Sequence, residues 1–403
     1  MPIAAKESNK IRSGTRMVFF LMGMIVFSSL SSAITQKILN FPIALPELLF
    51  LLFYVSFGKI IRAKFYLTKS ALNLLLTWGL LISIGIYFNE MRFYGILSTA
   101  RPYLYLIISY CLFSKVKEVN YENVYYVCLG SLVGWLFTAV YFFVYQFSIV
   151  TDEVSGVNGN MIAVAILMAC SVLLKPKTTL PILLLVMVVY FSSTLRRLLV
   201  VIAVSLLGSL LFYIRISKIK TMVFLFALFI AGSFFLSNKD IVSDFLDQRT
   251  PLVKYRTITK IELLFSNPVG IEIQRTIFIR NFFDKIEDYI LPRGFVSKQI
   301  SRDPTLGEYI DFPFQEITYT LGLFGASILL LIILWELYKV CVREITNPSI
   351  EQEIIIVTTI ICFILLFLEG TFISHAYITP FTGFVLGRLN YLSSKVRVKW
   401  PSP

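Results

Sequence analysis

Apolar runs of membrane-crossing length recur along almost the whole chain, and no other feature restricts its fold so strongly. A transmembrane helix needs about 20 predominantly apolar residues. Only 15% of the 403 residues are charged, whereas soluble domains carry about 25%. With so few charges the chain cannot cover a surface that faces water. A soluble enzyme, a disordered chain and a disulfide scaffold are excluded, and the sequence predicts an all-α, polytopic integral membrane protein.

These runs predict about twelve transmembrane helices, which together form a single transmembrane domain over residues 1–403. We place the helices at 17–34, 41–57, 71–88, 93–113, 123–148, 160–174, 179–193, 197–214, 221–237, 317–338, 354–373 and 376–393. The sixth and seventh runs are short and are separated only by residues 175–179, so they form either a tight hairpin or a partly re-entrant pair. The first run lacks a cleavage site of small residues, so we expect a retained span rather than a signal peptide.

The distribution of lysine and arginine predicts how these spans are oriented. The chain has 37 basic and 24 acidic residues and a net charge of +13. With the N-terminus in the cytoplasm, the cytoplasmic segments hold 20 Lys and Arg residues, whereas the short outer loops hold few. Basic residues are enriched in cytoplasmic loops. We therefore expect both termini in the cytoplasm, and we attribute the positive charge to membrane topology rather than to nucleic-acid binding.

One segment, residues 238–316, is too long and too rich in charge to be another short loop. On the predicted orientation it is a large extracytoplasmic loop, and long loops of this kind tend to be functional. Apolar residues at helical spacing over 271–290 predict an amphipathic helix on or near the membrane surface, so we expect short helices within the loop. Its arginines are Arg249, Arg256, Arg275, Arg280, Arg293 and Arg302.

Three arginines lie where the membrane makes a charge costly. Arg101 is about eight residues into the fourth span from its outer end, or about 12 Å deep. An arginine at the bilayer centre costs at least about 2.5–3.5 kcal/mol on insertion scales. Arg101 therefore either binds an anion in a water-filled cavity or snorkels to the outer headgroups. Arg196 and Arg197 stand at an outer span end, about 100° apart on a helix. They are either ligand-binding groups or interfacial anchors.

Several chemistries are not suggested by the sequence. There is no Gly-rich phosphate loop followed by Lys-Ser/Thr. The five cysteines form no CxxC, and His375 is the one histidine, so no metal site is expected. His375 is either a structural hydrogen-bonding residue or a base. What remains is a membrane cavity with several fixed arginines, whose forks suit phosphate and pyrophosphate. A pyrophosphate-linked lipid is the natural ligand.

Four stretches of the sequence resemble, in order, elements of the O-antigen polymerase and ligase group. Gly156–Asn160 is similar to a glycine/asparagine entry into a central span, and Ser193–Arg197 is similar to a Ser-Arg element at an outer span end. Arg256 with Asn267–Gly270 is similar to a loop element ending Asn-Pro-x-x-Gly, and Pro313–Gly325 is similar to a re-entry segment ending Gly-Leu-x-Gly. The resemblance covers residues 150–335, and the large late outer loop agrees with it.

The resemblance implies a polymerase of oligosaccharide repeat units linked to undecaprenyl diphosphate, in the bacterial inner membrane. The growing glycan leaves its carrier and passes to a sugar hydroxyl of a new repeat on another carrier. The diphosphate leaving group supplies the energy, so no nucleotide, metal or other cofactor is expected. The implied partners are the lipid-linked oligosaccharide, membrane lipid and a protein that regulates chain length.

Loss of the lipid diphosphate develops negative charge, which fixed arginines stabilise if they bind the transition state more tightly than the substrate. The candidate arginines are Arg101, Arg196, Arg197, Arg256, Arg275, Arg280 and Arg293. The acceptor hydroxyl needs a base. Candidates are Glu316, His375, Asp311 and Glu308, of which we place Glu316 and His375 at the catalytic site.

Two alternatives belong to other functional classes. The first is an O-antigen ligase, but the ligase branch usually shows His-Asn where this chain has Asp311-Phe312-Pro313-Phe314. The second is a non-enzymatic lipid-oligosaccharide flippase or another transporter, which twelve spans also fit. Transporters often show internal halves. Here no internal repeat is visible, and the large loop is late and external, so the polymerase is favoured.

Overall fold

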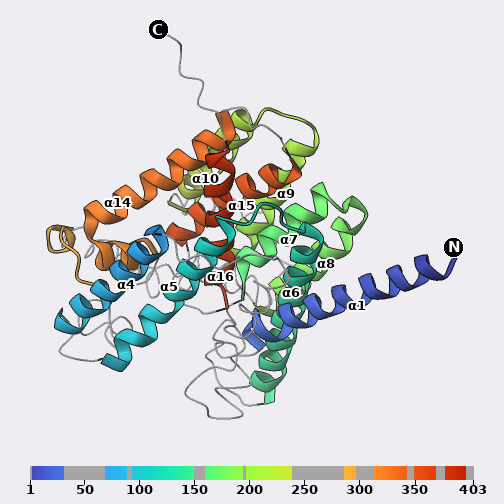
Figure 1. Cartoon of the computed structure of the whole chain (residues 1–403), viewed down its shortest axis with the longest axis horizontal. Helices are drawn as coiled ribbons and strands as arrows, with labels where there is room; N and C mark the ends of the chain where they lie inside the picture. Colours follow the sequence, from blue (N-terminus) through green and yellow to red (C-terminus); the bar gives the residue numbers. More distant parts are fainter. Residues whose placement is uncertain are drawn as a thin grey trace, which may run out of the picture.

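The structure of the chain is a computed structural model, and every element that it describes is a helix (Figure 1). The described residues are 2–30, 69–88, 93–148, 159–193, 197–237, 286–295, 313–342, 349–368 and 377–395. The α-helices are α1 (Pro2–Val26), α4 (Lys69–Phe88), α5 (Phe93–Phe113), α6 (Tyr121–Ser148), α7 (Met161–Leu173), α8 (Thr179–Ser193), α9 (Arg197–Tyr213), α10 (Lys218–Ser237), α14 (Pro313–Val342), α15 (Ile350–Leu368) and α16 (Thr379–Ser394). Two 3-10 helices are η2 (Pro176–Thr178) and η3 (Ile286–Tyr289). Within these ranges the all-α prediction is confirmed.

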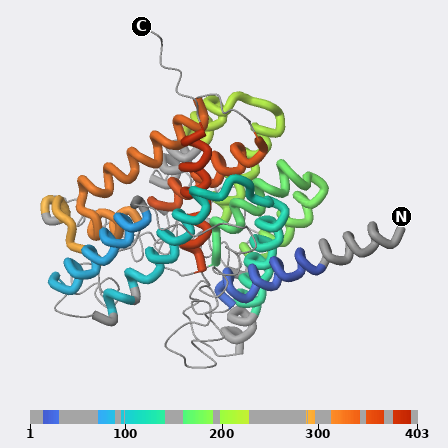
Figure 2. Tube along the Cα trace, in the orientation of Figure 1, coloured from blue at the N-terminus to red at the C-terminus, as the bar shows by residue number. Residues whose placement is uncertain are grey.

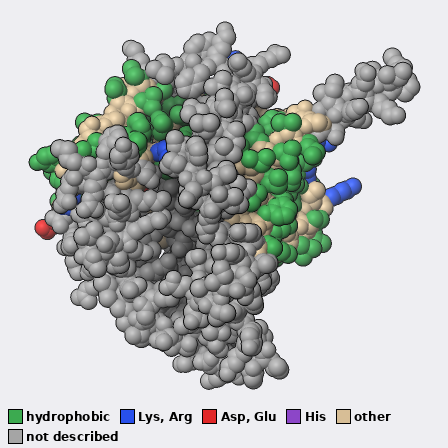
Figure 3. Space-filling model, turned by 90° about the horizontal axis from the view of Figure 1, so that it is seen from below, with side chains coloured by type: hydrophobic (Ala, Val, Ile, Leu, Met, Phe, Trp, Pro, Cys, Tyr) green, Lys and Arg blue, Asp and Glu red, His purple; other side chains and the backbone are tan. Residues whose placement is uncertain are grey.

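Five described helices are long and apolar enough to cross a membrane, namely α4, α5, α6, α14 and α15. Large apolar side chains such as Leu76 and Leu331 are more than 60% exposed, and Figure 3 shows large areas of exposed hydrophobic side chains. Such a surface suits lipid rather than water. The chain is therefore an all-α membrane protein. Every predicted span overlaps a described helix except 41–57, which lies outside the described residues.

Helix α7 lies at the centre of the protein. Every residue from Met161 to Val172 is buried, because α6, α9 and α15 pack around the helix. A helix that is apolar on all sides is expected to be buried on all sides. Its 13 residues extend over about 20 Å, which is shorter than the hydrocarbon core. A single 3-10 turn, η2, connects α7 to α8.

Glycines allow the two closest helix pairs, α1 with α6 and α5 with α16. A Cβ atom added at Gly130 of α6 would lie 2.8 Å from the backbone nitrogen of Met24. One added at Gly387 of α16 would lie 2.7 Å from the carbonyl oxygen of Tyr110. Small residues at membrane helix interfaces permit this close approach of two backbones. In Figure 2, α4, α5 and α14 lie at one end of the molecule, and α1, α6 and α8 lie at the other.

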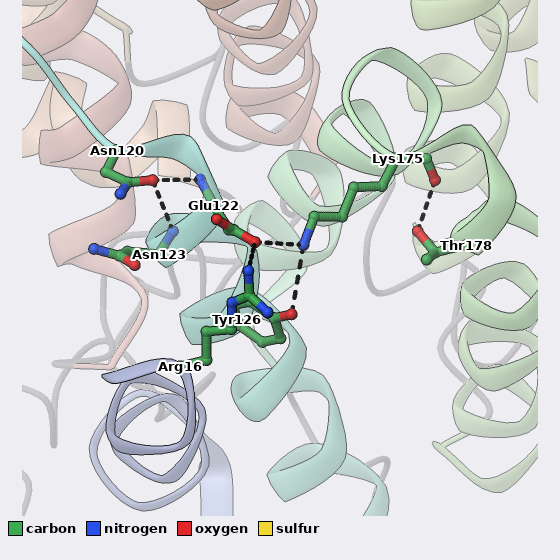
Figure 4. A network of polar contacts seen from close by, with 7 residues as sticks. All are labelled: Arg16, Asn120, Glu122, Asn123, Tyr126, Lys175 and Thr178. Atoms are coloured by element: carbon green, nitrogen blue, oxygen red, sulfur yellow. Dashed lines mark hydrogen bonds and ion pairs between the residues drawn. The ribbon is translucent and has the colours of Figure 1, made fainter. Parts of the chain in front are cut away.

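Segments predicted to share the cytoplasmic side lie together in the structure. Figure 4 shows Glu122, in the first turn of α6, between two cations. Its Oε1 lies 2.8 Å from Nη2 of Arg16 on α1 and 3.2 Å from Nζ of Lys175, just before η2. A second pair, fully buried on its arginine side, joins Arg388 of α16 to Glu351 of α15. Which side of the membrane these groups face stays a prediction.

Candidate functional site

The first turns of α14 carry the predicted base Glu316 and are set apart from the rest of the helix. The helix begins at Pro313, because proline suits the first helical turn and needs no partner for a backbone N–H there. It breaks at Gly322, where φ is 75° and ψ is 163°. This backbone conformation is essentially restricted to glycine. The span predicted at 317–338 is therefore part of a longer, broken helix.

The break makes room for the segment 286–295, which passes over α14 at this point. A Cβ atom added at Gly322 would lie 2.6 Å from the carbonyl oxygen of Ile290 and 2.9 Å from the nitrogen of Pro292. The backbone N–H of Arg293 donates to the carbonyl of Tyr319, 3.0 Å away, in the turn before the break. Helix ends leave carbonyls without intrahelical partners. The segment thus satisfies a backbone group that the break exposes.

The same segment is anchored on the other side by α4 and α5. The Phe295 N–H donates to the carbonyl of Leu81 over 3.2 Å. The Phe295 ring is 1% exposed and packs with Leu81, Ile96 and Ala100. Of the amphipathic helix predicted at 271–290, residues 271–285 lie outside the described residues, and Ile286–Tyr289 form the 3-10 turn η3. The part of the predicted outer loop at 286–295 is therefore fixed against three membrane helices.

At this junction Glu316 meets a tyrosine from α5. The Tyr103 hydroxyl donates to Glu316 Oε1 over 3.0 Å, and Glu316 is only 5% exposed. The Tyr103 ring packs on that of Phe295, with centroids 5.0 Å apart. An ionisable side chain within a membrane helix is costly, and such residues generally mark functional sites. The hydrogen bond joins α5 to α14, and the Tyr103 ring adds a packing contact with the segment 286–295.

Arg293 is a predicted diphosphate ligand on the segment that packs against these residues. Its guanidinium carbon lies 5.5 Å from the centre of the Tyr289 ring, and that ring lies 5.9 Å from the ring of Tyr319. Tyr319 follows Glu316 by three residues, so the two lie on the same face of α14. The structure thus brings Arg293 to the first turns of α14, which carry Glu316.

Arg101 stands on α5 close to the pair in sequence but on another side of the helix. It precedes Tyr103 by two positions, which corresponds to about 200° around the helix. At this level α5 is fixed to α4, because Nε1 of Trp78 donates to the carbonyl of Ala100 over 2.9 Å. The side chain of Arg101 is half-buried. Its predicted role in anion binding stays a prediction.

An apolar cavity adjoins the Tyr103–Glu316 pair. It lies between α4, α5, α14, α15 and α16 and has a volume of about 220 Å³. Tyr103 lines the cavity and bonds to Glu316. Thr320, one turn beyond Glu316, lines it as well. A polar pair at the edge of an apolar cavity is the arrangement that an amphiphilic ligand requires.

The remaining predicted site residues are not described at the level of side chains. Arg196, Arg256, Arg275, Arg280 and His375 lie outside the described residues. Arg197 is the first residue of α9, and its side chain is not described. Among the described residues no group of three His, Cys, Asp or Glu side chains could hold a metal ion.

The motif at Gly156–Asn160 has a structural explanation where it is described. The Asn160 side chain accepts from the N–H of Ala163 over 3.0 Å and donates to the carbonyl of Tyr377 over 2.8 Å. It therefore caps α7 and fixes the entry to α16. A Cβ atom at Gly159 would overlap the ring of Trp135. These contacts indicate packing and capping for the motif.

Sequence reasoning did not identify Tyr103. Its partner Glu316 is 213 positions away, so no local spacing connects the two. An aromatic residue in an apolar span has no signal that separates it from the many that face lipid. The one hint was its position two residues after Arg101, a charged residue within an apolar span.

Comparison with known proteins identifies no family, so the function is inferred from the sequence and the structure of this protein. A scan against protein-family models finds no match, and a search of curated proteins finds none either.

Proposed function

We propose that this chain is a membrane glycosyltransferase that polymerises oligosaccharide repeat units linked to undecaprenyl diphosphate, for an O-antigen or a related surface polysaccharide. The observation that carries the proposal is the Tyr103–Glu316 pair, buried where α5, α14 and the segment 286–295 meet. It places a carboxylate beside an arginine-bearing segment and an apolar cavity. These are the groups that transfer from a lipid diphosphate needs.

The proposal includes the complete topology, with about twelve spans, 238–316 as an extracytoplasmic loop and both termini in the cytoplasm. On that topology the end of α4, the start of α5 and the start of α14 all lie at the outer face of the bacterial inner membrane. Their close packing around the segment 286–295 supports the idea that these ends and the loop build one site. The site then faces the compartment in which repeats are joined.

In the reaction that we propose, a sugar hydroxyl of the new repeat attacks the anomeric carbon of the growing glycan. The new glycosidic C–O bond forms as the bond to the diphosphate oxygen breaks, and the leaving group keeps that electron pair. The hydroxyl proton passes to the Glu316 carboxylate, which later returns it to water. His375 is the second candidate base. Tyr103 orients Glu316 through the 3.0 Å hydrogen bond.

Arginines stabilise the charge that collects on the departing diphosphate. A cation that binds this charge more strongly in the transition state accelerates the step. The candidates are Arg101, Arg196, Arg197, Arg256, Arg275, Arg280 and Arg293. The breaking diphosphate bond drives the reaction, so the proposed partners are two lipid-linked oligosaccharides, membrane lipid and a chain-length regulator protein.

The test is Glu316→Gln in cells whose surface glycan depends on this protein. The amide keeps the size of the side chain and an acceptor for Tyr103 but cannot serve as a base, so polymerisation should fall about 100- to 10,000-fold. Long glycans should disappear, while single repeats still reach their acceptor. The matched control is Glu336→Gln on the same helix, where Glu336 lies 2.7 Å from Lys339, and it should leave the long glycans intact.

Three outcomes separate the alternatives. Normal long glycans in Glu316→Gln would exclude Glu316 as the base. Loss of all surface glycan, single repeats included, with lipid-linked repeats accumulating outside, would indicate a ligase. The same loss with repeats retained on the cytoplasmic side would indicate a flippase.

A further inference from the structure

We infer that the cavity between α4, α5, α14, α15 and α16 binds the apolar chain of the carrier lipid, with the isoprene units closest to the diphosphate inside it. The inference rests on the proposed function, because that function supplies the carrier. It goes further by assigning a binding place to the apolar chain of the lipid, which the polar groups alone do not specify. The cavity has a volume of about 220 Å³.

The lining determines the chemical class of the ligand. Leucine, isoleucine and aromatic side chains make up most of it, among them Leu81, Leu330, Ile333 and Leu366. A cavity with so much apolar lining favours apolar ligands over water, because water would lose most of its hydrogen bonds there. Its volume exceeds the roughly 150 Å³ of an engineered apolar cavity that binds benzene. A segment of an aliphatic chain therefore fits, whereas a sugar does not.

The surrounding helices indicate that the occupant comes from the bilayer. Of the five described helices that are long and apolar enough to cross a membrane, α4 and α14 are the least buried within the protein, and both line the cavity. The sides of these two helices that face away from the protein carry exposed apolar side chains, such as Leu76 on α4 and Leu331 on α14. The cavity thus lies directly behind the lipid-facing surface, and the apolar chain of a lipid reaches it from the membrane.

The polar edge of the cavity favours the carrier over a phospholipid. Tyr103 belongs to both the cavity wall and the Glu316 contact, and the segment that bears Arg293 packs on the same ring through Phe295. A head group on a chain in this cavity would lie at the site. The carrier has one chain beneath its diphosphate, whereas a phospholipid has two, and a single cavity of this size has room for one.

The probe is a farnesyl diphosphate that carries a diazirine on its prenyl chain, added to the purified full-length protein in detergent micelles. Photolysis followed by peptide mapping should place the label on α14 and α15 residues that line the cavity. Unlabelled farnesyl diphosphate in excess should suppress the label at least tenfold. The same excess of phosphatidylglycerol should leave it within twofold.

A matched pair of variants on α14 tests the position. Leu330 lines the cavity, whereas the side chain of the adjacent Leu331 is 64% exposed on the lipid-facing side of the helix. Leu330→Trp should fill the cavity and lower the labelling at least tenfold, and Leu331→Trp should not change it. If Leu330→Trp does not fold, as judged by size-exclusion elution, Leu330→Phe replaces it with an expected loss of at least threefold.

Label outside the cavity, or equal labelling of the Leu330 and Leu331 variants, would overturn the inference. Equal competition by phosphatidylglycerol would also overturn it, because the cavity would then be an ordinary lipid site. Labelling requires no turnover, so it is separable from the proposed function. If the protein is labelled as expected but makes no polymer, the cavity still binds the lipid chain, and the proposed polymerase function is rejected.

Discussion

Arg388 provides a sharp test of the packing that supports the site. It is 0% exposed, and its Nε donates to Glu351 Oε1 over 2.6 Å. Its Nη1 donates to the carbonyls of Phe113 and Val116 at the end of α5. Tyr121 at the start of α6 donates to the same carboxylate oxygen over 3.1 Å. One guanidinium therefore joins α5, α15 and α16, and through Glu351 it reaches α6.

Replacing Arg388 with methionine would leave Glu351 partly buried without its cation and two carbonyls without a donor. Breaking a buried ion pair from one side costs about 3–5 kcal/mol, and we expect the free energy of unfolding to fall by that amount. Arg16→Met is the internal control, because Arg16 and Glu122 are 41% and 40% exposed. An exposed pair contributes at most about 1 kcal/mol, and Lys175 remains beside Glu122.

The assay is urea-induced unfolding in mixed micelles, followed by tryptophan fluorescence. The double variant Arg388→Met with Glu351→Met should recover most of the loss, because a buried ion pair replaced by apolar side chains is often neutral. A loss below about 1 kcal/mol in Arg388→Met, or one equal to that of Arg16→Met, would refute the reasoning, because the burial of this pair would then carry no stability.

Two further predictions concern the site itself. Gly322→Ala should destabilise the protein by about 1–3 kcal/mol, because this φ/ψ region is unfavourable for alanine and the added Cβ would lie 2.6 Å from the carbonyl oxygen of Ile290. The control in the same unfolding assay is Gly79→Ala, whose added Cβ would have no atom within 4 Å. If Arg101 binds the diphosphate, Arg101→Gln should slow polymerisation about ten- to a hundredfold, since a hydrogen bond to a charged group is worth about 1.5–3 kcal/mol. Arg101→Lys should keep more activity. Wild-type turnover in Arg101→Gln would instead assign this arginine to the membrane interface.

The positions of the helices could be predicted because the bilayer sets both their length and their composition. The span predicted at 93–113 has the same bounds as α5, and 197–214 differs from α9 by one residue. The prediction at 317–338 missed both ends of α14, because a hydropathy criterion assigns polar residues to loops. The first turn contains Gln315 and Glu316, and the last turn contains Lys339. Helix starts follow local caps and proline as well as hydropathy.

The site could be predicted only in part, because its contacts join distant residues. Glu316 was named as a candidate base because the reaction implied by the resemblance needs one for the acceptor hydroxyl. Tyr103 was not, since the contact depends on how α5 packs against α14. Gly322 was noted as part of a motif, but the reason for it, the passage of residues 290–292 across the helix, is visible only in three dimensions.

The most direct measurement is turnover by the purified protein in liposomes, with one synthetic lipid-diphosphate-linked repeat unit and no nucleotide. We expect a ladder of longer lipid-linked glycans, with one lipid diphosphate released for each new linkage. Glu316→Gln should lower the rate about 100- to 10,000-fold, while Glu336→Gln should match the wild type. A wild-type protein that yields no product longer than the single repeat, under conditions in which it stays folded, would contradict the polymerase.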